Sequence, residues 1–426
     1  MKRLFSSLKF LSVSRRRDGQ TLPMTVLMVI VLFMFVGLGI DVTFAYITRA
    51  ALSKAVDAAC LGGIRSLHLG QPAALQVARS TFDMNYADSK VAGRQTAPPT
   101  VTPVFSTSPN GNVQLTVTAS VPIQTFFLRV IPMWRTFTVS VSAQATRARV
   151  ALSLILDRSG SMVGNGGAAA LPGAVATFID QFDESIDRAG MVSFASHATM
   201  DFNPIQSPFK TAIKNAANTM QFVGATFSPG GMTNAMQQLY AVPVTPTEDV
   251  VRVCVFFTDG WANTIQARIN CPDPRVYNIG GNAPTEGTYI AFVNPANGTI
   301  LCGGHGATPD TPVNPTGCGC TATTFRSEID GTQKAFTRRN LSTEAEYQCI
   351  RMADRMRQDG IIVYALGLGS ETSINRNFLR RLANDPSTPG HVPTFYDGEA
   401  LFAPTAAQLQ QVFEALANKI ILRLTQ

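Results

Sequence analysis

Two apolar runs, each followed by an acidic residue, constrain the fold of this chain more than any other feature. The first covers residues 150–156 and leads into Asp157, and the second covers residues 250–257 and leads into Thr258 and Asp259. Runs of this kind are typical of strands that are buried on both faces of a parallel sheet. Because ligands of such sheets bind at the carboxyl ends of the strands, both aspartates are candidate site residues.

Segments with helical patterns alternate with strand-like segments along the second half of the chain. This alternation predicts an α/β fold class, with a doubly wound, mostly parallel sheet in a domain over residues 149–426. The helices are expected over residues 171–187, 207–220, 233–242, 343–358, 373–384 and 406–424, and further strands over residues 190–194, 360–366 and 393–396.

Hydroxyl side chains accompany the two aspartates. Asp157, Ser159 and Ser161 lie on one short loop, where a carboxylate and two hydroxyls can close on a hard divalent cation. A Gly-Gly-Met-Thr-Asn segment between the two strands offers a third hydroxyl. We select Thr233 there over its rival Thr226, because the residues after Thr233 continue as a helix. Taken alone, an Asp-x-Ser-x-Ser string also fits an ordinary turn or helix cap.

This combination resembles the von Willebrand factor A domain and its metal-ion-dependent adhesion site. The resemblance implies that Asp157, Ser159 and Ser161 ligate a cation directly, and that Thr233 and Asp259 do so directly or through water. Mg²⁺ is the expected ion, with Mn²⁺ or Ca²⁺ as alternatives, since hard cations prefer oxygen ligands. The resemblance also implies a protein partner that presents an acidic residue to the ion.

The amino-terminal region predicts a membrane anchor. Residues 21–40 carry no charge and are long enough to cross about 30 Å of hydrocarbon as one helix. By the positive-inside rule, the basic leader over residues 1–20 stays in the cytoplasm and everything after Asp41 is exported. We expect a single-pass protein of the bacterial inner membrane with its C-terminal domain in the periplasm or outside the cell. A cleavable secretory signal is the alternative. The basic residues of the leader are Lys2, Arg3, Lys9, Arg15, Arg16 and Arg17.

Those six charges account for most of the net charge of +7, which therefore indicates topology and not nucleic-acid binding. Residues 41–148 follow the span. The span ends in Gly39-Ile40-Asp41 and runs into an alanine-rich helix. Residues 41–148 also include two period-two segments, 112–122 and 137–145, that predict a pair of half-buried strands.

This segment resembles the amino-terminal part of TadE/TadG-like proteins of the Tad (Flp) pilus assembly system. The resemblance implies a role in pilus assembly or in cell-surface adhesion, with pilus assembly components as partners.

Residues 261–341 are rich in Gly, Pro, Asn and Thr and show no sustained periodicity, so we expect a loop-rich insertion beside the metal site. In an exported protein its cysteines predict a disulfide framework. A zinc site that uses His305 with three of these cysteines is the alternative. Cys254 in the second apolar run is expected to be a buried apolar residue. The disulfide candidates are Cys271, Cys302, Cys318, Cys320 and Cys349.

The leading functional hypothesis is a binding protein and not an enzyme. No G-x-S-x-G motif surrounds Ser159 or Ser161, and Ser159 occupies the place where an aspartyl-phosphate phosphatase carries its second acid. A purely structural envelope or minor pilus component, in which the metal only stabilises loops, is the second hypothesis, and a metal-assisted hydrolase is the third.

Overall fold

The computed structural model describes residues 21–87, 95–243, 249–269, 276–282, 288–306, 308–314, 319–320, 322–370 and 373–425. The chain divides into two compact units. The first comprises Met1–Cys60, Ala78–Val104 and Thr116–Gln144, and the second comprises Leu61–Val77, Phe105–Leu115 and Ala145–Gln426.

The first unit combines a long helix with a small sheet. Most of α1 (Thr21–Arg65) and the end of α2 (Gln71–Ala87) belong to it, with strands in the order β1-β2-β3. The strands are β1 (Thr100–Thr107), β2 (Val113–Gln124) and β3 (Thr136–Arg147), of which the sequence predicted the last two. Alternate residues of β2 are buried, as the period-two pattern requires. The thiol of Cys60 donates to the carbonyl of Ala143 at 3.2 Å, so α1 contacts the sheet.

The amino-terminal half of α1 differs from the rest of the helix. Residues 22–36 are all exposed, although they are almost entirely apolar. By length and composition this helix could cross a membrane. Gly37 and Asp41 are the first buried residues of α1, and buried side chains recur from Thr48 and Leu52 onward, where the helix becomes alanine-rich.

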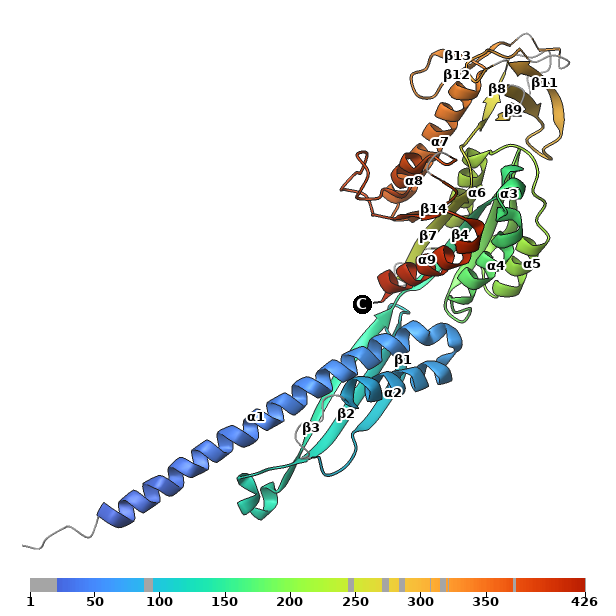
Figure 1. Cartoon of the computed structure of the whole chain (residues 1–426). Coiled ribbons are helices and arrows are strands. Elements are labelled where there is room, and N and C mark those ends of the chain that lie inside the picture. The colour runs from blue at the N-terminus through green and yellow to red at the C-terminus, as the bar shows by residue number, and fades with distance from the viewer. Residues whose placement is uncertain are drawn as a thin grey trace, which may run out of the picture. The chain divides into compact units, whose positions relative to one another are not determined.

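The core of the second unit is a mixed sheet with the strand order β15-β14-β7-β4-β5-β6. Its strands β14, β7 and β4 are labelled in Figure 1. Neighbouring strands pair in parallel except β5 and β6, which are antiparallel. The predicted α/β class with a mostly parallel sheet is therefore confirmed. The strands are β4 (Arg149–Asp157), β5 (Arg188–Phe194), β6 (Ala198–Gln206), β7 (Val250–Thr258), β14 (Ile362–Leu368) and β15 (Ala400–Ala403).

Helices cover both faces of this sheet. Leu154 and Leu156 of β4 pack into one hydrophobic cluster with α4 (Gly167–Asp180), α5 (Lys210–Asn218) and α9 (Leu409–Leu424). Ile155 points the opposite way and packs with α6 (Ser228–Tyr240), α7 (Arg338–Gln358) and α8 (Arg376–Ala383). Since successive side chains of a strand face opposite sides, an uninterrupted apolar run fills both layers. The short helices are α3 (Ser161–Gly164), η1 (Ser66–Leu69) and η4 (Ala406–Gln408).

One predicted strand was wrong. The strand expected at residues 393–396 is a turn, and the edge strand is β15 instead, which pairs with β14 through Ala365 and Ala400. Pro393 has no N–H to donate to a ladder, which disfavours a strand there.

The insertion is a folded layer rather than a collection of loops. It contains a sheet in the antiparallel order β11-β10-β9-β8 and the hairpin β12-β13. Ile265, Ile279 and Phe292 form its hydrophobic cluster together with Leu341 of α7. The strands are β8 (Thr264–Arg268), β9 (Val276–Asn282), β10 (Thr288–Val293), β11 (Ile300–Gly306), β12 (Thr324–Arg326) and β13 (Gln333–Ala335).

A buried ion pair lies where the second unit's sheet begins. The Nη2 atom of Arg147 is 2.7 Å from Oδ2 of Asp187, and both side chains are at most 2% exposed. Asp187 also accepts hydrogen bonds from the backbone N–H groups of Val150 and Asp183 at 3.2 and 2.8 Å. The carboxylate therefore joins the end of β3, the start of β4 and the turn before β5.

We predict that Asp187→Ala lowers the free energy of unfolding by about 3–5 kcal/mol, because it leaves a buried guanidinium without its partner. Asp180→Ala is the matched control. Asp180 pairs with Lys214 at 2.6 Å but is half exposed, so its removal should cost at most about 1 kcal/mol. Urea denaturation followed by circular dichroism measures both. Equal losses of unfolding free energy in Asp187→Ala and Asp180→Ala would contradict the structural role of the buried Arg147–Asp187 pair.

A second prediction concerns Glu346 on α7. Burial raises the pKa of Glu346 to about 7, although Asn375 donates to both of its carboxylate oxygens and opposes the shift. The folded state thus holds this proton more tightly than the unfolded state, so stability falls as the pH rises from about 4.5 to about 7. Glu346→Gln should match the parent protein at pH 4.5 and exceed its stability above pH 7 by on the order of 2 kcal/mol. Melting temperatures across this range test it, with the exposed Glu414→Gln as a control that should show no such gain.

Candidate metal centre

The sheet brings Asp157 and Asp259 to the same edge. β4 and β7 are parallel neighbours with Leu156 opposite Phe257, so Asp157 lies beside Thr258 and Asp259 follows directly. The chain continues from β4 to β5 on one side and later adds β7 on the other. Strand order therefore reverses at β4, which is where doubly wound sheets bind their ligands.

Asp157 is fully buried and held by its neighbours. Its Oδ1 accepts the backbone N–H of Ser159 at 2.7 Å, and its Oδ2 accepts the hydroxyl of Thr258 at 2.5 Å. The first bond shapes the tight turn after β4, and the second ties that turn to β7. Thr258 is a site residue that sequence reasoning did not single out, although it stands next to Asp259 at the strand end.

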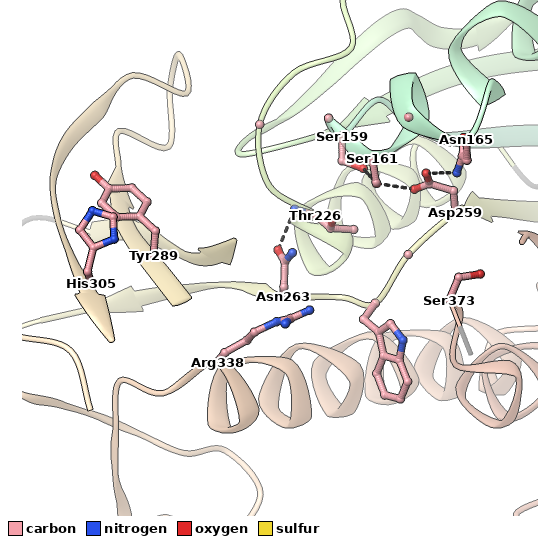
Figure 2. Close-up of a pocket in the computed structure, with 15 residues that line it drawn as sticks. Ser159, Ser161, Asn165, Thr226, Asp259, Asn263, Tyr289, His305, Arg338 and Ser373 are labelled. Atoms are coloured by element: carbon pink, nitrogen blue, oxygen red, sulfur yellow. Dashed lines mark hydrogen bonds between the residues drawn. The ribbon is translucent and has the colours of Figure 1, made fainter. Parts of the chain in front are cut away.

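The two serines link this loop to Asp259. The hydroxyls of Ser159 and Ser161 are 2.9 Å apart, and Ser161 donates to Oδ1 of Asp259 at 2.7 Å (Figure 2). The side-chain amide of Asn165 donates to Oδ2 of Asp259 at 2.5 Å. Asn165 was also missed by the sequence analysis; its place four residues after Ser161, just past one helical turn, is the signal that could have identified it.

Burial dominates the electrostatics of this cluster. It raises the pKa of Asp157, and the nearby charge of Asp259 raises it further, while hydrogen bonds from Ser159 and Thr258 oppose the shift. Burial also raises the pKa of Asp259 against the hydrogen bonds from Ser161 and Asn165. In the described part of the chain, no salt bridge reaches either carboxylate. Two buried carboxylates among hydroxyl oxygens make a donor set that fits a hard divalent cation, whose charge would offset their repulsion.

Thr233 does not belong to this cluster. Its hydroxyl donates to the carbonyl of Pro229 at 2.8 Å and contacts the sulfur of Met352 at 3.1 Å. The structure does not bring Thr233 to the cluster because α6 begins at Ser228, five residues earlier than expected, so Thr233 lies inside the helix and bonds back along it. A proline at the first turn, here Pro229, is the sequence signal for this earlier start.

The rival residue, Thr226, lines the same hollow as Ser159, Ser161 and Asp259. Its loop is held in place from two sides. The N–H of Gly160 donates to the carbonyl of Gly224 at 3.0 Å, and the N–H of Thr226 donates to Oδ1 of Asn263 at 2.8 Å (Figure 2). Gly224 has φ of +101°, and a Cβ there would meet the side chain of Ser196 at 2.5 Å, so this approach requires glycine.

The insertion forms one wall of this hollow, which has a volume of about 900 Å³. Trp261 and Asn263 lie at the start of the insertion, Tyr289 and His305 lie on its sheet, and Arg338 opens α7. Figure 2 shows Arg338 and Asn263 between the serine cluster and the side chains of Tyr289 and His305. A ligand that reached the oxygen cluster would therefore also meet a guanidinium and aromatic rings.

The cysteines divide into two groups. Cys302 and Cys320 are disulfide-bonded, which argues against the alternative zinc site because their sulfurs are already engaged. Cys271 and Cys318 lie outside the described residues. Cys349 was wrongly included among the disulfide candidates: it is a free thiol, fully buried in the cluster between α7 and the sheet. Cys254 is likewise free and buried, as expected.

Comparisons with known families cover two parts of the chain. The family model of the von Willebrand factor type A domain matches residues 152–280, and that of the Flp pilus-assembly TadE/G-like family matches residues 19–74. No curated protein sequence matches the chain.

Several solved structures match parts of the chain at low identity. One is proximal thread matrix protein 1 from the mussel byssus with a zinc-occupied MIDAS motif, at 14% identity and a TM-score of 0.35, covering 66% of this chain and 46% of that one. The von Willebrand factor domain of the type V pili tip protein Mfa5 from Porphyromonas gingivalis is 13% identical with a TM-score of 0.41, covering 65% and 97%. The PilB minor pilin from Streptococcus sanguinis is 13% identical with a TM-score of 0.40, covering 76% and 79%. The chain spans about half the length of the mussel protein.

The two threonines provide a matched test of the site. We predict that Thr226→Ala weakens the binding of Mg²⁺ or Mn²⁺ by about tenfold or more, the scale on which altered metal-site shells act. Thr233→Ala should leave cation affinity unchanged, because that hydroxyl already donates to the carbonyl of Pro229 and contacts the sulfur of Met352. Isothermal titration with each cation measures both. A larger loss of cation affinity in Thr233→Ala than in Thr226→Ala would instead identify Thr233 as the ligand.

Proposed function

We propose that this protein, which carries a von Willebrand factor type A domain behind a TadE/G-like amino-terminal segment, binds an acidic residue of a protein partner through a divalent cation. Mg²⁺ is the ion we expect. The setting we propose is pilus assembly or cell-surface adhesion, in which the protein is anchored in the bacterial inner membrane by α1 and its C-terminal domain is exported.

The observation that carries this proposal is that Ser159, Ser161 and Asp259 are joined by hydrogen bonds and line one hollow together with Thr226. The buried Asp157 adjoins them, because it accepts the backbone N–H of Ser159. These residues would hold the cation. Because several of the donors are neutral hydroxyls, a bound cation would keep enough positive charge to attract one more anionic oxygen. A partner carboxylate is the group that suits such a position.

The wall of the hollow supports the same ligand class. Arg338 adds a permanent positive charge, which favours an anionic group. Trp261 is 41% exposed beside it, and exposed tryptophan is enriched among residues that dominate binding energy at protein interfaces. Both residues belong to the insertion or its junction with α7, so this layer would set which partner is accepted.

Binding is favoured over hydrolysis by the way the serines are engaged. No G-x-S-x-G motif surrounds Ser159 or Ser161, and in the described part of the chain no histidine hydrogen-bonds to either serine. The two hydroxyls contact each other, and Ser161 donates to Asp259, which also accepts from Asn165. This arrangement suits ligation of a cation better than proton abstraction.

The membrane anchor rests on separate observations. The uncharged run in α1 is exposed along its whole length up to Val36, and the TadE/G-like match begins at residue 19 and includes this run. Six basic residues before the run favour a cytoplasmic amino terminus.

We predict that Asp157→Ala abolishes both cation binding and recovery of the partner, because it removes the carboxylate at the centre of the site. The measurement is a pull-down from cell-envelope extracts with the full-length protein, in Mg²⁺ and in chelator. Asp180→Ala, which removes a half-exposed carboxylate elsewhere in the domain, is the control and should behave like the parent protein.

Recovery of the same partner in chelator would overturn the adhesion mechanism. If chelator instead lowered the melting temperature and no ligand depended on the metal, the ion would serve only to stabilise the loops, and the structural alternative would hold.

A further inference from the structure

The connection between β2 and β3 exposes an unusual concentration of large apolar side chains. Phe126, Val130, Met133 and Trp134 are 50%, 84%, 78% and 51% exposed, all within residues 125–135. Clustered apolar surface of this kind marks a site of contact with a protein, a membrane or a ligand, since scattered single apolar residues are the norm on a water-facing surface. The question is therefore what covers it.

This connection is an ordered structure. The N–H and the hydroxyl of Thr125 donate to the carbonyls of Arg135 and Trp134 at 3.1 and 2.7 Å, which closes the base of the connection. Two short helical turns, η2 (Leu128–Val130) and η3 (Pro132–Trp134), lie between these ends. The apolar side chains are thus presented from a fixed backbone.

Asp41 of α1 fastens this connection to the helix. Its Oδ1 accepts the N–H of Phe126 at 2.7 Å, and its Oδ2 accepts the N–H groups of Phe127 and Leu128 at 3.0 and 2.9 Å. Asp41 is only 2% exposed. A buried carboxylate that accepts several N–H groups is a strong, charge-assisted attachment.

A second contact lies one helical turn earlier. The ring of Phe127 packs against Gly37, where a Cβ would lie 2.4 Å from the ring, so glycine is needed for this approach. Gly37 is buried, whereas the neighbouring residues of the uncharged run are exposed. The connection therefore touches α1 at the carboxyl-terminal end of residues 21–40, and Asp41 is the first charge after that run.

This position coincides with the edge of a bilayer. Twenty helical residues rise about 30 Å, the thickness of the hydrocarbon layer, so Gly37 and Asp41 lie near its outer boundary when the run spans it. Tryptophan and arginine are characteristic of that boundary. Arg129 and Arg135 are exposed on the same connection, and the guanidinium of Arg129 lies 5.5 Å from the centre of the Phe126 ring.

We propose that residues 125–135 are a second membrane contact, which inserts Phe126, Val130, Met133 and Trp134 into the outer interface of the bilayer beside α1. This inference rests on the membrane anchoring proposed above. The lipid surface is the partner, with its phosphate groups facing Arg129 and Arg135. Asp41 holds the contact at the correct depth, and the first unit is attached to the membrane at two points.

Tryptophan fluorescence tests this contact directly. The chain has two tryptophans, so Trp261→Phe leaves Trp134 as the single emitter. The full-length variant is placed in phosphatidylcholine–phosphatidylglycerol vesicles whose acyl chains carry bromine at a known depth, and only protein that floats with the vesicles is measured. We expect loss of Trp134 emission, greatest for bromines about 5–10 Å below the headgroups, where interfacial side chains lie.

Two further variants separate insertion from folding. Val130→Ser with Met133→Ser changes only highly exposed side chains, and it should reduce the quenching while the circular dichroism spectrum stays the same. Asp41→Ala should also reduce the quenching of Trp134, because it releases the connection from α1. Asp57→Ala, at an exposed position further along α1, should leave the quenching unchanged.

Each remaining outcome overturns the proposal in a distinguishable way. Floating protein with unquenched Trp134 would refute the second contact and leave the anchor intact. Protein that does not float with the vesicles would refute both the second contact and the membrane anchor. Emission that depends on the density of protein in the vesicles, and not on bromine, would show that a second copy of the chain covers the patch.

Discussion

The parallel pairing of β4 with β7 places two carboxylates, Asp157 and Asp259, in one buried position, and the rest of the site depends on this constraint. Neither strand can shift without moving apolar side chains out of both helical layers, because its residues fill the two hydrophobic clusters alternately. The like charges are therefore forced together by packing. Hydrogen bonds from Thr258, Ser161 and Asn165 offset part of the cost, and a divalent cation is the charge that would offset the remainder.

The insertion forms one wall of the hollow beside this oxygen cluster. Its own hydrophobic cluster includes Leu341 and Ala345 from the first turns of α7, while Cys349, Ala353 and Met356 further along the same helix pack on the sheet. One helix thus belongs to both cores. The wall that carries Arg338 and Trp261 is accordingly held by the same packing that holds the metal-site loops, which favours a preformed binding surface.

Sequence reasoning failed where local patterns were short or ambiguous. The insertion strands are rich in glycine, as in β9 and β11, so their periodicity is weak, and their burial depends on partners from α7 and from the neighbouring strands. Cys349 was grouped with the insertion cysteines by proximity in sequence, yet the helix turns its thiol into the core. Thr233 was preferred to Thr226 because the start of α6 was placed too late, and a shift of five residues decides whether a hydroxyl faces the loop or bonds within the helix.

The amino-acid sequence by itself determined the α/β class, the exposed uncharged helix, and the pairing of an Asp-x-Ser-x-Ser loop with a second aspartate at a strand end. These follow from periodicity and charge, which are local properties of the chain. Only the tertiary structure decided that Thr226 lines the hollow, that Thr258 and Asn165 support the carboxylates, and that residues 125–135 are fastened to Asp41. Each of these contacts joins segments whose approach is set by strand order, helix packing or a glycine-dependent close contact, and no local pattern encodes such distances.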